Sequence, residues 1–248
     1  MRCKFFFSLC STCEIATVRR LRAVEEESFA DDMTFSFTFQ FCCDVSLYAV
    51  QTFLPAIIKG LGYTSVKANL MTVPVYLLGM FWFLFIAYMS DRTRKRGVWI
   101  GGPLLLMIAG EAILIAATKT QIRFFGCFVT ILGIYPTVGL SIMWLSDNVG
   151  RHFKRASMVG MVLTIANTSG VAVGQIYRAQ EAPRYVKGLT ISLGLNVVSL
   201  ACILGLMGGM WWVNKARHER IVAAEQAGNP LPEQPEKGDY DVHFVYSL

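Results

Sequence analysis

The chain has 248 residues, of which 54% are hydrophobic and only 16% are charged. Soluble domains carry about a quarter charged residues, so this composition excludes most soluble classes and is typical of a membrane protein. The net charge of +6 does not indicate a nucleic-acid partner, because the basic residues gather in links between apolar segments, as in multi-span membrane proteins.

Residues 1–34 form the first segment, which we predict to be a disordered cytoplasmic lead. Its apolar run is too brief for a secretory signal, and no A-x-A cleavage pattern follows. Cys10 and Cys13 make a lone C-x-x-C, with neither a second pair nor a histidine at ligand spacing. We therefore expect no metal and no cofactor.

Six segments that follow are each long and apolar enough to cross a bilayer. A helix needs about 20 apolar residues to cross the hydrocarbon layer, and each segment has 20 to 26 residues. The segments are 35–58, 70–89, 98–118, 124–146, 157–177 and 188–213. The sequence thus predicts an all-α membrane protein, with a bundle of six transmembrane helices over residues 35–213.

The links alternate in positive charge, which predicts the orientation of the bundle. Of the 23 Lys and Arg residues, 16 fall in the lead, the second-to-third link, the fourth-to-fifth link and the tail. The more basic side faces the cytoplasm. We therefore expect an integral, multi-pass protein with both termini in the cytoplasm. Residues 214–248, which are rich in Pro, Glu and Gly near their end, are predicted to be a disordered cytoplasmic tail.

Asp44 lies ten residues into the first predicted span, roughly 15 Å deep on a rise of 1.5 Å per residue. A carboxylate at that depth must be protonated, paired or in contact with water. One interpretation is a proton carrier, because desolvation favours the protonated carboxyl group. The other is that the helix begins later and Asp44 caps its N-terminus.

The link after the second span reads S-D-R-T-R-K-R-G over residues 90–97. On charge alone it is a basic loop that sets topology, in which arginines can bind helix carbonyls or lipid phosphates. Its order resembles the cytoplasmic signature of the major facilitator superfamily, G-x-L-[SA]-D-R-x-G-[RK]-[RK]. Ala87 replaces the first glycine of that signature, and Thr93-Arg94 stands at the second.

Further segments resemble one fungal branch of that superfamily, the anion:cation symporters related to allantoate, nicotinate, pantothenate and biotin permeases. The segments are 53–58, 61–64, 69–76, 166–167, 174–177 and 182–185. The resemblance extends over roughly residues 44–214 and matches the carboxy-terminal half of the family. It implies one six-helix half of a twelve-span major facilitator fold, in which two halves rock about a site at the midplane.

The resemblance implies secondary transport of small organic anions, of the carboxylate vitamin or ureide class, by proton-coupled symport at the plasma membrane. The implied partners are the lipid bilayer, the anion and a proton. The alternative is a truncated half-transporter without activity of its own, or a partner of full-length permeases, assembled with a second half or with itself. No enzyme is expected, because H-E-x-x-H and G-x-G-D motifs are absent and all three histidines lie in links or tail.

In this fold the first and fourth spans of each half line the cavity, so amide and aromatic groups there suit a planar carboxylate. The candidate substrate-binding residues are Tyr48, Gln51, Tyr135, Asn167 and Gln175. Such residues also join helices in lipid or mark membrane interfaces.

Two further sets of candidates concern protons and gating. Glu111, in the middle of the third span, is a proton-coupling candidate beside Asp44, and could instead pair with a group on a neighbouring helix. Asp91, Arg92 and Arg96 form the predicted cytoplasmic gating loop. By the pseudo-symmetry of the family fold, the loop of Asp91 is expected to engage a helix of the other half.

Overall fold

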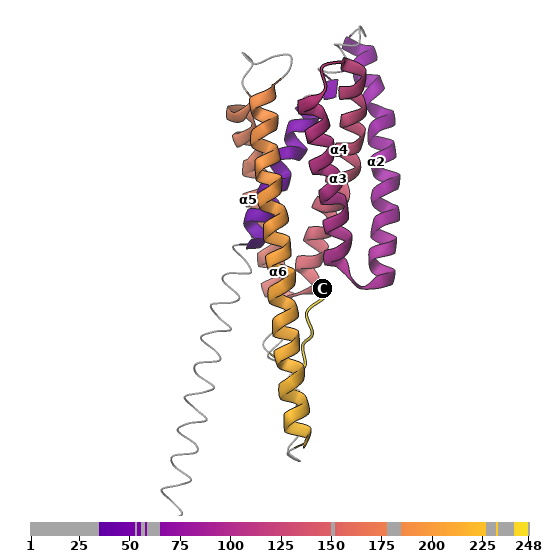
Figure 1. Cartoon of the computed structure of the whole chain (residues 1–248). Coiled ribbons are helices and arrows are strands. Elements are labelled where there is room, and N and C mark those ends of the chain that lie inside the picture. The colour runs from indigo at the N-terminus through magenta and orange to yellow at the C-terminus, as the bar shows by residue number, and fades with distance from the viewer. Residues whose placement is uncertain are drawn as a thin grey trace, which may run out of the picture. The chain divides into compact units, whose positions relative to one another are not determined.

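The computed structural model describes residues 35–52, 54–55, 58, 65–149, 152–177, 185–226, 232 and 241–247. The chain divides into a unit Met1–Phe35 and a compact unit Ser36–Leu248, which holds the helical bundle. After a helix over residues 35–52, the elements are α2 (Ser65–Thr93), α3 (Arg96–Ala116), α4 (Thr120–Asp147), α5 (His152–Ile176) and α6 (Val186–Gln226) (Figure 1).

The all-α prediction is confirmed. Helices α2 to α6 are all long and apolar enough to cross a membrane. The second to sixth predicted spans coincide with them, apart from shifts at the ends. The first predicted span, 35–58, is helical at every residue of it that the structure describes. Asp44 therefore lies inside a helix rather than at its start, which excludes the helix-cap interpretation.

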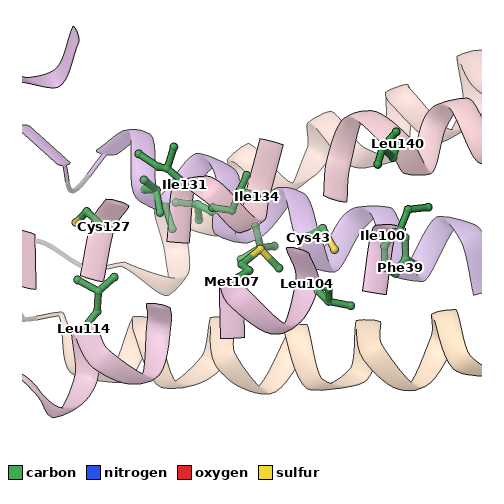
Figure 2. Close-up of a cluster of buried hydrophobic side chains, with 14 of the residues drawn as sticks. Phe39, Cys43, Ile100, Leu104, Met107, Leu114, Cys127, Ile131, Ile134 and Leu140 are labelled. Carbon is green, nitrogen blue, oxygen red and sulfur yellow. The ribbon is translucent and has the colours of Figure 1, made fainter. Parts of the chain in front are cut away.

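The first helix runs through the centre of the bundle. Cys43 on this helix is fully buried, and Figure 2 shows it beside Leu104 and Met107 of α3, with Ile134 of α4 nearby. Buried thiols and thioethers serve here as apolar fillers. A helix surrounded by others can place polar side chains in the interior only if neighbouring helices supply partners, as α4 and α6 do for this one.

Helices α3 and α4 are in close contact because glycines lie at their interface. A Cβ atom on Gly133 would collide with the backbone of Met107 and Pro103, and one on Gly110 would collide with Thr130. Small residues let helix backbones approach closely in a membrane. Because the glycine-bearing face of α3 packs against α4, a different face of α3 is directed at α6, and Glu111 lies on that face.

Helix α6 corrects the predicted boundary of the tail. The sequence predicts disorder from residue 214, yet α6 continues to Gln226 and has 41 residues, or roughly 60 Å at 1.5 Å per residue. Residues 244–247 then contact the bundle again through Asn214 and Arg217. The physical reason is that a bilayer of about 30 Å limits the apolar length of a helix and not its total length.

Candidate functional site

Glu111 occupies the middle of α3 and is 2% exposed. Asn196 of α6 donates a hydrogen bond from Nδ2 to Glu111 Oε2 at 2.8 Å, and the same nitrogen donates to Ser46 Oγ of the first helix at 2.7 Å. Three helices thus meet at one carboxyl group. Of the two sequence interpretations of Glu111, pairing with a neighbouring helix is what these contacts show, and a role in proton transfer remains a prediction.

The amide of Asn196 is only partly satisfied. Asn196 is fully buried, and its Oδ1 atom has no hydrogen-bond partner. An ionised Glu111 needs a hydrogen-bond donor, whereas a protonated Glu111 also needs an acceptor. A side-chain amide has two donor hydrogens and one acceptor oxygen, so it can serve either form. The free oxygen gives this cluster capacity to accept one more hydrogen bond.

Asn196 belongs to a buried polar stripe on α6 that sequence reasoning missed. Ser192 shares a 2.6 Å hydrogen bond with the hydroxyl of Tyr177, and Ser199 donates to the Phe39 carbonyl at 3.4 Å. The stripe residues follow at intervals of four and three, which puts them on one helix face. The spacing of Ser192, Asn196 and Ser199 is the feature of the sequence from which this buried stripe could have been predicted.

Asp44 lies in a separate cluster. It is 7% exposed, and Gln40, one turn earlier, donates to its Oδ1 atom at 3.5 Å. The carbonyl oxygen of the Gln40 side chain accepts a hydrogen bond from Ser141 Oγ of α4. The two proton-coupling candidates are therefore not brought together, because Asp44 is linked toward α4 while Glu111 is linked to α6.

The Tyr48 hydroxyl donates to Asn167 Oδ1 of α5 at 2.6 Å, which joins two of the substrate-binding candidates across 119 positions of sequence. Asn167, Gln51 and Gln175 are exposed on the surface of the bundle. An exposed amide within an apolar span is costly against lipid, so such residues face a bundle interior or a water-filled cavity.

Tyr135 does not share the surroundings of Tyr48. It lies on α4 facing α2, where a Cβ on Gly79 would stand 2.8 Å from the Tyr135 ring. Its ring lines an apolar groove with Tyr76 and Phe83. The structure therefore separates Tyr135 from the Tyr48–Asn167 pair, because the two tyrosines lie against different neighbouring helices.

The loop between α2 and α3 is held by ion pairs. Arg96 donates from Nη2 to Asp91 Oδ1 at 2.9 Å and from Nε to Asp147 Oδ2, at the end of α4, at 2.8 Å. Arg92 reaches the Tyr88 hydroxyl at 3.4 Å. We call this region, where α2 and α4 end and α3 begins, the basic end. In this structure Asp91 pairs within its own loop, and its expected engagement with another half stays a prediction.

Among the residues that the structure describes, no three His, Cys, Asp or Glu residues gather as a metal site. Cys10 and Cys13 lie outside the described residues.

Comparison with known proteins finds relatives that are named as transporters. The chain is 38% identical over 223 residues to an uncharacterized transporter of Schizosaccharomyces pombe, covering 90% of this chain and 44% of that protein. It is 35% identical over 206 residues to the high-affinity nicotinic acid transporter of Saccharomyces cerevisiae, covering 83% of this chain and 39% of the relative. An MFS-type transporter of Hormonema carpetanum is 28% identical over 176 residues, or 70% of this chain and 36% of that protein. No family model matches the chain.

The fold also resembles a solved structure. The crystal structure of the POT family transporter PepTSo superimposes with a TM-score of 0.61 at 15% identity, over 75% of this chain and 42% of that one. The chain thus spans less than half the length of each of these four proteins. The protein is an integral, multi-pass membrane protein related to transporters, and its fold matches a half-domain of a transporter of the major facilitator type.

Proposed function

We propose that this chain takes part in proton-coupled symport of small organic anions, of the carboxylate vitamin or ureide class, across the plasma membrane. Its 35% identity to a protein named as a nicotinic acid transporter supports the substrate class. Nicotinate is a planar carboxylate, which hydroxyl and amide donors can bind without a buried cation.

The polar face formed by the first helix and α5 is the observation that carries this proposal. The Tyr48 hydroxyl donates to Asn167 Oδ1 there at 2.6 Å, and Gln51 lies one turn from Tyr48 on the first helix. Helix α5 also exposes apolar side chains such as Met161 and Val171, whereas the exposed side chains of α2 are largely apolar, including Leu70, Phe81 and Phe85. A face with exposed amides beside lipid-compatible faces fits the wall of an aqueous cavity. We assign anion binding to Tyr48, Gln51, Asn167 and Gln175.

Glu111 and Asp44 are the proposed proton-coupling residues. Each carboxyl is buried inside the bundle and hydrogen-bonded to an amide side chain, Asn196 and Gln40 respectively. An amide can donate to an ionised carboxylate or accept from a protonated one, so both states can be stabilised at the same place. A carboxyl group paired with an amide can therefore take up and release a proton without losing its hydrogen-bond partner.

The polar face is open on its outer side, so the proposal includes a complementary partner. A second six-helix half, or a second copy of this chain, would close the cavity and rock against this bundle. The basic end would then face the cytoplasm together with both termini, and Asp91, Arg92 and Arg96 would form its gating loop.

Uptake by the reconstituted chain tests this proposal. Purified protein in liposomes is expected to accumulate radiolabelled nicotinate when the exterior is made acidic, and a protonophore should abolish the accumulation. Asp44→Asn and Glu111→Gln are each expected to abolish proton-driven uptake while the protein stays in the membrane. Asn167→Ala should weaken uptake, whereas Asn69→Ala, a matched change at an exposed asparagine of α2, should not. Normal proton-driven accumulation by Asp44→Asn would remove that residue from the mechanism.

The second candidate is a half-transporter without transport activity of its own, which associates with full-length permeases. The open polar face favours it, because one bundle leaves the proposed cavity wall uncovered. Absence of nicotinate uptake by the chain alone, with altered uptake when a full-length relative is reconstituted beside it, would select this candidate over autonomous symport.

A further inference from the structure

Residues 244–247, which we call the strap, return to the basic end of the bundle after α6 (Figure 1, yellow). Asn214 of α6 binds the backbone of Tyr246 twice. Its Nδ2 atom donates to the Tyr246 carbonyl at 2.9 Å, and its Oδ1 atom accepts from the Tyr246 N–H at 2.9 Å. One side-chain amide therefore satisfies both polar groups of one residue.

Asn148, at the end of α4, repeats this arrangement at the next residue of the strap. The Ser247 N–H donates to Asn148 Oδ1 at 2.7 Å, and Asn148 Nδ2 donates to the Ser247 carbonyl at 3.3 Å. Trp144, one turn earlier on α4, adds a hydrogen bond from its Nε1 atom to the same carbonyl at 2.7 Å. Both polar backbone groups of Ser247 are thus bound from α4.

The alternation of partners shows how the strap is held. In extended backbone the N–H and C=O groups of one residue point to the same edge, and those of the next residue point to the opposite edge. Tyr246 is bound from α6 and Ser247 from α4. The two helices therefore bind opposite edges of the strap, as neighbouring strands do in a sheet.

Arg217 of α6 supplies the remaining contacts. It is 5% exposed, donates from Nη1 to the Phe244 carbonyl at 2.8 Å, and lies 4.9 Å from the centre of the Tyr246 ring. A buried guanidinium needs acceptors, and both a carbonyl and an aromatic face provide them. Val245 is 74% exposed, so its side chain projects out of the site while the backbone on either side of it is bound.

We propose that Trp144, Asn148, Asn214 and Arg217 form a binding site for extended peptide backbone, and that the strap of this chain occupies it and fastens the end of α4 to α6. Because each helix binds a different edge, α4 cannot separate from α6 at the basic end without breaking the hydrogen bonds of one edge. Release of the strap frees the end of α4 to move. This proposal does not depend on the transported substrate.

A nitroxide at position 245 tests occupancy of the site. Val245→Cys is labelled in a background with Cys3, Cys10 and Cys13 changed to Ser, since Cys42, Cys43, Cys127 and Cys202 are buried. We expect a restricted spectrum for the otherwise unchanged chain. In Asn148→Ala with Asn214→Ala, the restricted component should be lost, and Asn214→Asp, which keeps the acceptor for Tyr246 N–H but loses the donor, should give an intermediate spectrum.

His218→Ala is the matched control, because His218 is exposed one turn beyond Asn214 on α6. It should leave the restricted component unchanged. A mobile label in the chain with all its asparagines, or a restricted label in the double variant, would overturn the assignment of the site.

A second measurement tests the fastening itself. Spin labels at exposed positions 143 of α4 and 220 of α6 report the separation of the two helices at the basic end. The distance distribution should broaden when the strap is released, and an unchanged distribution would refute the fastening role.

Truncation avoids any substitution within the site. A variant ending at residue 240 should bind a fluorescent peptide with the sequence of residues 241–247, while the whole chain should not, because its own strap occupies the site. Equal binding by both, or binding by neither, would contradict the proposal.

Discussion

Two clusters of charged and amide side chains join the helices of this protein, and their surroundings differ. In the interior, Glu111 is bound by Asn196 and is 2% exposed. At the basic end, Arg96 pairs with Asp91 and Asp147, whose side chains are 54% and 41% exposed. Water can replace a lost partner at the basic end and cannot do so in the interior. The same kinds of contact should therefore contribute very different free energies of unfolding.

The largest effect is expected for Asn196→Leu. This change removes the donor to Glu111 Oε2 and to Ser46 Oγ and leaves the buried carboxyl short of a partner. We expect it to lower the free energy of unfolding by about 3 kcal/mol. Thermal unfolding in detergent, followed by circular dichroism, measures the loss.

The double variant Asn196→Leu with Glu111→Leu is the control for this prediction. It replaces both polar partners by apolar groups and should be less destabilised than Asn196→Leu alone. Destabilisation equal to the sum of the two single changes would show that the pair is not coupled.

Gly133→Ala tests how tightly α3 and α4 pack in the interior, without changing any polar contact. The added Cβ would collide with the backbone of Met107 and Pro103, which cannot move aside as a side-chain tip can. We expect a loss of about 2 kcal/mol in the free energy of unfolding. Gly102→Ala on α3 is the matched control, because its Cβ would have nothing within 4 Å. Equal melting temperatures for the two variants would mean that the α3–α4 contact adapts freely.

The sequence predicted what local composition determines. The six spans follow from the length and apolarity of each segment, and the helices lie where those segments lie. The pairing of Tyr48 with Asn167 could not be read from the sequence, because it joins residues 119 positions apart. The continuation of α6 past residue 213 could have been found, since residues 215–226 are rich in the helix formers Ala, Glu, Arg and Lys.

Asn196 shows why the polar contacts of the interior were harder to predict. An asparagine in a span is compatible with lipid-facing, cavity-facing or helix-joining positions, and only the position of Glu111 on another helix distinguishes them. Tyr135 shows the converse: its residue type suits the proposed cavity, but its helix face turns toward α2, and its part in substrate binding stays a prediction. Residue type was informative, and the neighbouring helix was not encoded locally.

At the basic end, Arg94→Gly is expected to stabilise the protein. Arg94 follows the last residue of α2 with φ at 53°, and its N–H donates to the Ser90 carbonyl at 3.0 Å. A left-handed backbone is unfavourable for a residue with a Cβ atom and natural for glycine. The gain should be about 0.5–1 kcal/mol, because glycine also loses more entropy on folding. Lys95→Gly, at the adjacent position with φ at −116°, should not stabilise. A lower melting temperature for Arg94→Gly would mean that its side chain contributes more than its backbone conformation costs.

The smallest effect is expected for the ion pair between Arg96 and Asp147, although Nε and Oδ2 are only 2.8 Å apart. The Asp147 side chain is 41% exposed and that of Arg96 is 16% exposed, so water reaches the pair mainly from the Asp147 side. A double-mutant cycle with Arg96→Gln and Asp147→Asn should therefore give a coupling energy of about 0.5 kcal/mol. The coupling should shrink further in high salt, because exposed charges are screened. Arg92→Gln with Asp147→Asn is the control cycle, since Arg92 contacts Tyr88 instead, and its coupling should be near zero. A salt-independent coupling as large as that of the Glu111–Asn196 pair would show that the basic end is shielded from water, and the contrast between the two clusters would fail.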